Sequence, residues 1–285
     1  KNNKRVAVHA TERITAQLAV EAGADYLVHS VDDEVVSDAF VQLLKQKKTI
    51  LCPTLVVMGN YGKVLGDHYH FNTDELNLAN PETIGSVLDY PWPDTTTAKM
   101  YIKSMSSAVQ AAREITGDSI MTVNLRKLVS GGVIIATGTD AGNTGTQHAS
   151  SYFIELDAMQ KAGMNTWQLL EASTINGAKA MGQEKEWGSI AKNKTANLLL
   201  FWANPLDSLS NWRKISQVIV KGVAHLPETL VNPTPEYLVQ QQLNGYNAHN
   251  LEAFLEPYAE DVELYEFPGK LIMKGKDAMQ KDYVF

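Results

Sequence analysis

Short apolar runs alternate with stretches of helical periodicity over the first fifty residues of the chain. Two apolar runs, residues 5–10 and 25–30, each lead to a histidine, and each precedes a stretch, 12–22 and 33–47, whose apolar residues recur every three or four positions. A third apolar run at 48–53 completes the pattern. Strands that alternate with helices of ten to fifteen residues indicate βαβ units, so we expect a parallel sheet.

The ends of the predicted helices carry recognisable signals. Gly23 follows the first helix and is typical of a helix stop. Asp32 is the expected N-cap of the second helix, with Asp33 and Glu34 in its first turn, where negative charge is favourable.

Residues 54–97 break this rhythm with several glycines and prolines. The segment is longer than a normal βα connection, and such excursions are typical of lids or binding loops. His68 and His70 lie two apart in it, and we favour a surface or lid role for this pair over a catalytic one. The aromatic residues of the segment are expected either to cover a substrate or to anchor the loop: Tyr61, Tyr69, Tyr90 and Trp92.

Regular patterning returns after this excursion. Residues 131–138 (GGVIIATG) predict a buried strand that leads into Asp140, and a Gly- and Thr-rich loop continues to His148. Further helices are predicted at 98–115, 119–130, 151–162, 166–181 and within 236–256. Further strands are predicted at 188–190, 197–202, 215–220, 262–267 and 270–274.

Composition excludes several classes of protein. The 285 residues are 44% hydrophobic and 20% charged, which argues against disorder and fibrous repeats. The net charge of −7 makes a nucleic-acid or anionic-membrane partner unexpected, and no apolar run approaches the length of a membrane span. One cysteine, Cys52, excludes a disulfide framework within the chain. The compartment stays open, with a soluble cytoplasmic or an exported protein both compatible.

Two histidines and one aspartate carry the chemical signal. His9 and His29 are twenty residues apart, about one βα unit, so both are expected at the carboxyl ends of consecutive strands. Neighbouring strands lie about 4.8 Å apart, which lets two imidazoles reach one metal ion. Asp140 follows a third strand and is expected at the same edge. Two His and one Asp at strand ends are typical of a metal-dependent hydrolase; the alternative is that each His hydrogen-bonds a neighbouring loop.

These motifs together resemble the second half of the amidohydrolase superfamily, in particular its imidazolonepropionase-related members, over residues 5–222. RVAVHA resembles the fifth barrel strand of the family, DYLVHS the sixth and ATGTDAG the eighth. The resemblance implies that His9, His29 and Asp140 are metal ligands and that Asp140 is also the general base. Residues 155–190 are similar to the family's segment after the eighth strand, although Asn197 stands downstream where the family usually has Asp.

The resemblance implies an α/β fold with part of a TIM (β/α)8 barrel, about strands 5–8, and a small β-sandwich segment. The tail, with YNAHNLEAFLEPYAEDVELYEF, resembles the start of a nuclear-transport-factor-2-like (SnoaL-like) α+β cone domain, a type that dimerises or holds small ligands and so allows a homo-oligomer. The expected domains are the barrel half at 1–187, the sandwich segment at 188–226, a linker at 227–235 and a truncated cone domain at 236–285.

The family's first-strand His-x-His pair and fourth-strand Lys are absent from this sequence, which opens at Lys1. We therefore expect a fragment that lacks the N-terminal metal ligands and that is unstable and inactive by itself.

The implied activity is hydrolysis of a carbon–nitrogen bond in a small amide, cyclic amide or peptide-like substrate by metal-activated water. Zinc is favoured, as one or two ions, although manganese, iron or nickel also suit these ligands. His148 either contacts the substrate or is a solvent-exposed loop residue. The alternative function is a non-catalytic binding or assembly protein with a degenerate barrel and a dimerising cone domain.

Overall fold

A computed structural model describes residues 4–65, 69–88, 96, 99–100, 102–103, 119–231 and 233–283. The chain divides into two compact units. Unit 1 comprises Lys1–Gly59, Ser104–Asp140 and Tyr152–Val231, and unit 2 comprises Asn60–Lys103, Ala141–Ser151 and Asn232–Phe285. His68, Tyr90, Trp92 and most of the helix predicted at 98–115 lie outside the described residues.

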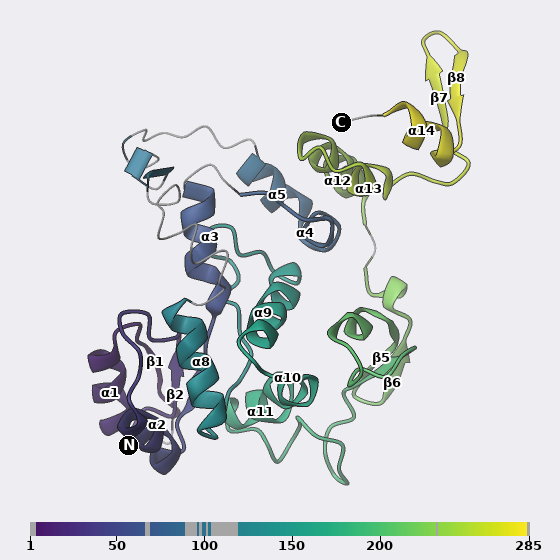
Figure 1. The fold of residues 1–285 in the computed structure, drawn as a ribbon. Helices are drawn as coiled ribbons and strands as arrows, with labels where there is room; N and C mark the ends of the chain where they lie inside the picture. Colours follow the sequence, from purple (N-terminus) through teal and green to yellow (C-terminus); the bar gives the residue numbers. More distant parts are fainter. Residues whose placement is uncertain are drawn as a thin grey trace. The chain divides into compact units, whose positions relative to one another are not determined.

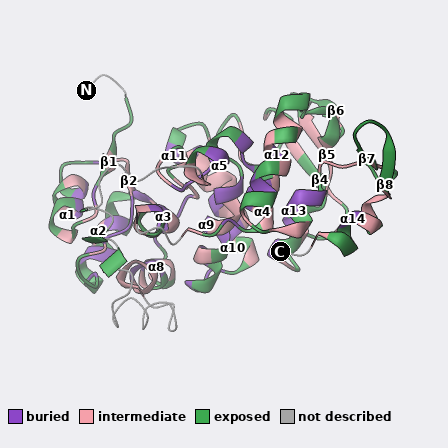
Figure 2. Ribbon diagram, turned by 90° about the horizontal axis from the view of Figure 1, so that it is seen from above, coloured by how far each residue is buried: buried purple, intermediate pink, exposed green. Residues whose placement is uncertain are grey.

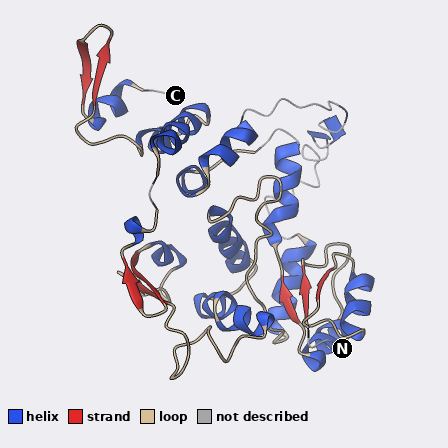
Figure 3. Ribbon diagram, turned by 180° about the vertical axis from the view of Figure 1, so that it is seen from behind, coloured by secondary structure: helices blue, strands red, loops and turns tan. Residues whose placement is uncertain are grey.

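A parallel sheet forms the centre of unit 1 and confirms the βαβ pattern. Its strands are β1 (Ala7–His9), β2 (Tyr26–Val28) and β3 (Ile50–Cys52), with β2 in the middle. The helices α1 (Arg13–Glu21) and α2 (Asp38–Lys47) connect them. The three short strands lie side by side with these helices beside them (Figures 1 and 3).

The start of α2 differs from the prediction, because the helix begins five residues later than expected. Its N-cap is Ser37, whose side chain accepts a hydrogen bond from the backbone N–H of Phe40. Asp33 instead accepts hydrogen bonds from the backbone N–H groups of Arg13 and Glu34. The acidic residues therefore join the two βα connections rather than cap the helix.

The strand predicted at 131–138 is also reduced, to one isolated parallel bridge between Leu51 and Ile135. Residues 134 and 136 each make a backbone hydrogen bond with Leu51, so this segment does run beside β3. The pairing stops because the N–H of Thr137 turns to the carbonyl of Ala172, and the side chain of Asn176 donates to the carbonyl of Ile135.

The described residues of the long excursion after β3 are mostly helical rather than irregular, whereas a lid or binding role for the segment stays a prediction. The helices are α3 (Leu55–Leu65), α4 (Thr73–Leu78) and α5 (Pro81–Leu88). A capping box explains the start of α4, since Asn72 and Glu75 each accept a hydrogen bond from the other's backbone N–H. Proline at the first position of α5 suits a helix start.

The remaining described elements of unit 1 follow the predictions with three exceptions, one of which is a strand at 223–225 that the sequence pattern does not predict. The helix expected at 166–181 is broken at Thr174 into two, and the segment at 188–190 is not a strand. The helices are α8 (Ile120–Ser130), α9 (Ser150–Lys161, which starts in unit 2), α10 (Thr166–Ser173) and α11 (Ile175–Met181). A small antiparallel sheet contains β4 (Leu198–Phe201), β5 (Ile215–Val220) and β6 (Val223–His225), accompanied by short 3-10 turns at Leu209–Arg213 and Pro227–Thr229.

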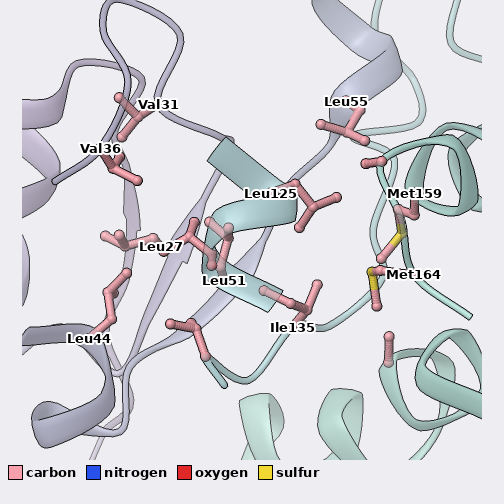
Figure 4. Packing of buried hydrophobic residues seen from close by; sticks show 14 of the residues in the cluster. Leu27, Val31, Val36, Leu44, Leu51, Leu55, Leu125, Ile135, Met159 and Met164 are labelled. Carbon is pink, nitrogen blue, oxygen red and sulfur yellow. The ribbon is translucent and has the colours of Figure 1, made fainter. Parts of the chain in front are cut away.

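One hydrophobic cluster joins the parallel sheet to its helices. Leu27 and Leu51 come from adjacent strands and meet Leu44 of α2, Leu125 of α8 and Ile135, all nearly inaccessible to solvent (Figure 4). Burial of each such side chain contributes about 1.5–3 kcal/mol, so this cluster is the main support of the strand ends. The described helices include no bilayer-spanning segment.

In unit 2 the C-terminal helices pack against the excursion helices. The C-terminal elements are α12 (Pro235–Asn247), α13 (Leu251–Leu255), the hairpin β7 (Glu263–Glu266) and β8 (Lys270–Lys274), and α14 (Lys276–Asp282). Ala253 belongs to the same hydrophobic cluster as Leu76 and Ile84, and the Asn244 amide donates to the Pro81 carbonyl at 2.6 Å. Buried parts of α4, α5 and α13 appear in purple, whereas the hairpin is mostly exposed (Figure 2).

Candidate metal and proton-transfer site

His29 follows β2 and is fixed by the backbone on both sides. Its N–H donates to the carbonyl of Cys52 at 2.9 Å, and the N–H of Ser30 donates to the carbonyl of Pro53 at 3.0 Å. These bonds continue the parallel pairing of β2 with β3 beyond the strands themselves. The side chain of His29 is buried, with a relative exposure of 9% for the residue, so its ring has a restricted set of positions.

Three side chains surround the His29 imidazole. Its Nδ1 lies 2.5 Å from Oγ1 of Thr54, and its Nε2 lies 3.9 Å from Oδ2 of Asp140. The His9 ring packs edge-on against it, with ring centroids 4.5 Å apart. The structure therefore brings together His9, His29 and Asp140, which the sequence motifs single out, and adds Thr54, which they do not.

The electrostatic surroundings favour neutral His29. Burial, followed by repulsion from His9, lowers the pKa of the His29 imidazole, while the nearby carboxylates of Asp140 and Asp32 act in the opposite direction. A lowered pKa leaves a ring nitrogen with a lone pair at neutral pH, which is the form that binds a metal or accepts a proton.

A second acid, Asp32, lies in the electrostatic environment of His29. Burial and the neighbouring Asp33 raise the pKa of the Asp32 carboxyl, and the influence of His29 lowers it. Its sequence position, three residues after His29, predicts a helix cap and conceals this proximity.

Backbone conformation at the strand ends is unusual. The φ angle is +75° at His29, +46° at Thr54 and +56° at Asp140. Left-handed backbone is uncommon outside glycine and strained for a β-branched residue such as Thr54, at a cost of about 1–3 kcal/mol. Strain of this kind persists only where surrounding contacts over-determine the conformation, and it clusters at functional sites.

Cys52 stands next to this site without a chemical role of its own. Burial, with the negative charges of Glu155 and Asp140, raises the pKa of the Cys52 thiol to about 12, so the thiol stays protonated and unreactive. Its sulfur occupies the space beside Gly138, where an added Cβ would collide with it. Gly138 thus allows the segment before Asp140 to approach β3 closely.

The donor set fits a divalent metal by type, and one ligand pair fits by distance. Two ligands at about 2.0–2.2 Å from one ion lie no more than about 4.2 Å apart, and the His29–Asp140 pair satisfies this limit. Among the described residues, no three His, Cys, Asp or Glu side chains converge as a complete ligand group. The pair His29 and Asp140 is therefore the part of the predicted set that the observed spacing supports most directly.

His148 lies in unit 2 and is exposed. Within that unit, the loop at 141–147 is held by polar contacts: the Asn60 amide donates to the carbonyl of Gly145 at 3.1 Å, and the hydroxyl of Tyr61 donates to Asn143. The hydroxyl of Tyr69 also donates to the Gly145 carbonyl. Two aromatic residues of the predicted lid, Tyr61 and Tyr69, thus anchor this loop. A substrate contact by His148 stays a prediction.

Residues 1–224 match the sequence model of the amidohydrolase family, and the chain belongs to that family. Among curated relatives, an imidazolonepropionase of Flavobacterium johnsoniae is 30% identical over 137 residues, which are 48% of this chain and 29% of that protein. A 5-methylthioadenosine/S-adenosylhomocysteine deaminase of Teredinibacter turnerae is 30% identical over 105 residues, 34% of this chain and 24% of that protein.

Solved structures show the same fold. A Xaa-Pro dipeptidase with bound methionine has a TM-score of 0.53 and 23% identity, covering 78% of this chain and 45% of that one. Phenylurea hydrolase B has a TM-score of 0.52 and 20% identity, covering 80% and 45% of the two chains. The chain thus spans less than a third of these curated relatives and less than half of these solved structures.

Proposed function

We propose that this chain contributes His9, His29 and Asp140 to the active site of a metal-dependent hydrolase that cleaves carbon–nitrogen bonds. The observation that carries the proposal is the 3.9 Å spacing between Nε2 of His29 and Oδ2 of Asp140, with the His9 ring packed beside His29. Membership of the amidohydrolase family supports the same reaction class.

Each residue has a distinct role in this proposal. The imidazoles of His9 and His29, with the Asp140 carboxylate, hold a divalent ion, for which zinc is favoured. The ion supplies the Lewis acidity that makes water nucleophilic near neutral pH. Asp140, whose side chain is 39% exposed, is accessible to water; it accepts a proton from the attacking water and returns it to the departing nitrogen.

The wider architecture follows the same resemblance. In the proposal β1, β2 and β3, with the segment at 134–136, correspond to strands 5–8 of a (β/α)8 barrel, whose active site lies at the carboxyl ends of the strands. The sheet β4–β6 corresponds to the sandwich segment and the tail to the beginning of a cone-like domain. The substrate is a small molecule with an amide, cyclic amide or peptide-like bond, and His148 contacts it from the loop after Asp140.

The test uses the full-length protein. Zinc content and hydrolysis of a panel of cyclic amides, simple amides and dipeptides are measured for the parent, His9→Ala and Asp140→Asn. The proposal expects bound zinc in the parent, less zinc in His9→Ala, and loss of hydrolysis in both variants. Hydrolysis that persists in both variants would refute the catalytic assignment, and a parent that binds no zinc and hydrolyses nothing would favour the non-catalytic binding protein.

A further inference from the structure

Glu155 is a fully buried carboxylate that the proposed reaction does not use. It lies on α9, and its two oxygens accept hydrogen bonds from the backbone N–H groups of Leu55 at 2.9 Å and Val56 at 3.1 Å. These two residues begin α3, directly after Thr54. Glu155 therefore binds the turn that connects β3 to α3, a hundred residues away in sequence.

The reason for this long-range contact lies in Thr54. A threonine just before a helix normally accepts a hydrogen bond from a backbone N–H of the first turn. Here the Thr54 hydroxyl is 2.5 Å from Nδ1 of His29 instead. The first N–H groups of α3 need another acceptor, and the two oxygens of the Glu155 carboxylate accept one hydrogen bond each.

We propose that Glu155 is a positioning residue for this site: it holds the β3–α3 turn in the conformation that places the Thr54 hydroxyl against the His29 ring. With the Nδ1 hydrogen donated to Thr54, the lone pair of Nε2 is directed toward Asp140. The proposal rests on the proposed function, since His29 is a metal ligand there. It adds a residue that touches neither metal nor substrate and acts through two intervening groups.

Two further observations support this role. Thr54 has a φ of +46°, a conformation that a β-branched residue keeps only under restraint, and Glu155 restrains the two residues that follow it. Burial also raises the pKa of Glu155 to about 7, although the two N–H groups lower it, so a buried carboxyl is retained here at an energetic cost. A helix cap alone requires no such group, because a short polar side chain next to the helix serves that purpose.

The test compares Glu155→Gln, Thr54→Val and the double variant in the full-length protein. Glutamine preserves size but presents an NH₂ group to one backbone N–H, and valine preserves shape without the hydroxyl. Asp157→Asn is the matched control, because it makes the same acid-to-amide change at an exposed position of α9. Thr54→Ser is the conservative rescue. Zinc affinity, measured with zinc alone by competition with a chromophoric chelator at pH 7.5, is the main readout, with kcat, KM and Tm alongside.

We expect Thr54→Val and Glu155→Gln each to weaken zinc binding by about tenfold or more, as removal of a ligand's supporting partner does. The value of kcat falls while KM changes little, and Asp157→Asn and Thr54→Ser retain zinc affinity near that of the parent. Because Glu155 acts through Thr54, the double variant binds zinc no more weakly than Thr54→Val alone, within about twofold.

Two outcomes would overturn the positioning role. The first is parental zinc affinity in Glu155→Gln, whatever its Tm, which leaves only a structural role. The second is a double variant whose loss of zinc affinity equals the product of the two single-variant losses. Such a result would mean that Glu155 affects zinc binding independently of Thr54. His29→Asn separates this inference from the proposed function: parental zinc affinity in that variant refutes both, whereas loss of zinc there with retention in Glu155→Gln refutes the inference alone.

Discussion

Nε2 of His29 lies 3.9 Å from Oδ2 of Asp140, although the two residues belong to different βα units. Parallel pairing produces this proximity: β2 pairs with β3, and Leu51 of β3 pairs with Ile135 in the segment that leads to Asp140. These strands and the segment at 134–136 run in the same direction, so the residues that follow them meet at one edge of the sheet. The contact therefore depends on strand order rather than on any local motif.

Replacement of Asp140 by asparagine is expected to remove catalysis and preserve the fold. Asparagine has the same shape and tolerates the left-handed backbone that Asp140 adopts at φ +56°. Loss of the proton acceptor lowers kcat by about 10²–10⁴-fold, the usual contribution of a general base. Steady-state kinetics of the full-length protein, with urea unfolding, measure both effects. An Asp140→Asn protein with parental kcat would exclude this residue as the base.

Replacements of His9 and His29 are expected to change the free energy of unfolding by different amounts, although both residues belong to the proposed metal site. His9 is exposed, so His9→Ala changes the free energy of unfolding by no more than about 0.5 kcal/mol. His29 is buried against Thr54, so His29→Asn leaves the threonine hydroxyl without its partner and costs about 1–3 kcal/mol. Both variants lose zinc affinity. Equal unfolding free energies for the two variants would contradict the packing assigned to His29.

Periodicity predicts the βαβ part of the fold well because each strand and helix there is locally encoded. The apolar runs that become β1, β2 and β3 are short and uninterrupted, and Gly23 ends the first helical stretch. The segment at 131–138 shows the limit of this reasoning. Its apolar residues predict a strand, but Thr137 and Ile135 bond with the α10–α11 region, so tertiary contacts shorten the pairing.

The site is only half visible in sequence. His9, His29 and Asp140 stand at the ends of predicted strands, where residue type and position are both informative. Thr54 and Glu155 carry no such signal, because a threonine before a helix predicts a cap and a glutamate within a helix predicts a solvated face. Their roles arise from contacts spanning 25 and 100 residues, which no local pattern encodes.

Glu155 is expected to make stability depend on pH in a defined direction. Its pKa is raised from 4.5 to about 7 in the folded state, so the unfolded chain releases this proton first. Its contribution to folding is complete below about pH 4.5 and is lost as the pH rises through 7, a loss of about 3 kcal/mol. Glutamine cannot titrate, so the stability gap between the parent and Glu155→Gln narrows by that amount from pH 4.5 to pH 8.

Urea unfolding of the full-length protein across this pH range measures the gap. The Asp157→Asn variant serves as the control, because it makes the same acid-to-amide change at an exposed position of α9. If the stabilities of the parent and Glu155→Gln change in parallel with pH, the Glu155 carboxyl has the same pKa in the folded and unfolded states, contrary to the raised pKa.

Asn244 tests whether the C-terminal helices depend on the excursion helices of unit 2. Its side chain is fully buried, donates to the Pro81 carbonyl at 2.6 Å and accepts from Gln240 at 2.9 Å. Asn244→Ala leaves the buried Pro81 carbonyl without its donor, so we expect the free energy of unfolding of unit 2 to fall by about 1–3 kcal/mol. Asn247→Ala makes the same change at an exposed position of α12 and should stay within about 0.5 kcal/mol of the parent.

Amide hydrogen exchange shows which helices the Asn244→Ala change destabilises. If α12 and α5 form one cooperative body, Asn244→Ala accelerates amide exchange in both helices, because loss of their shared contact opens them together. A tail that folds as an independent cone-like domain predicts faster exchange in α12 with no change in α5. The hydrophobic cluster that unites Ala253 with Leu76 and Ile84 favours the first result, since separating the helices would expose all three apolar side chains to water.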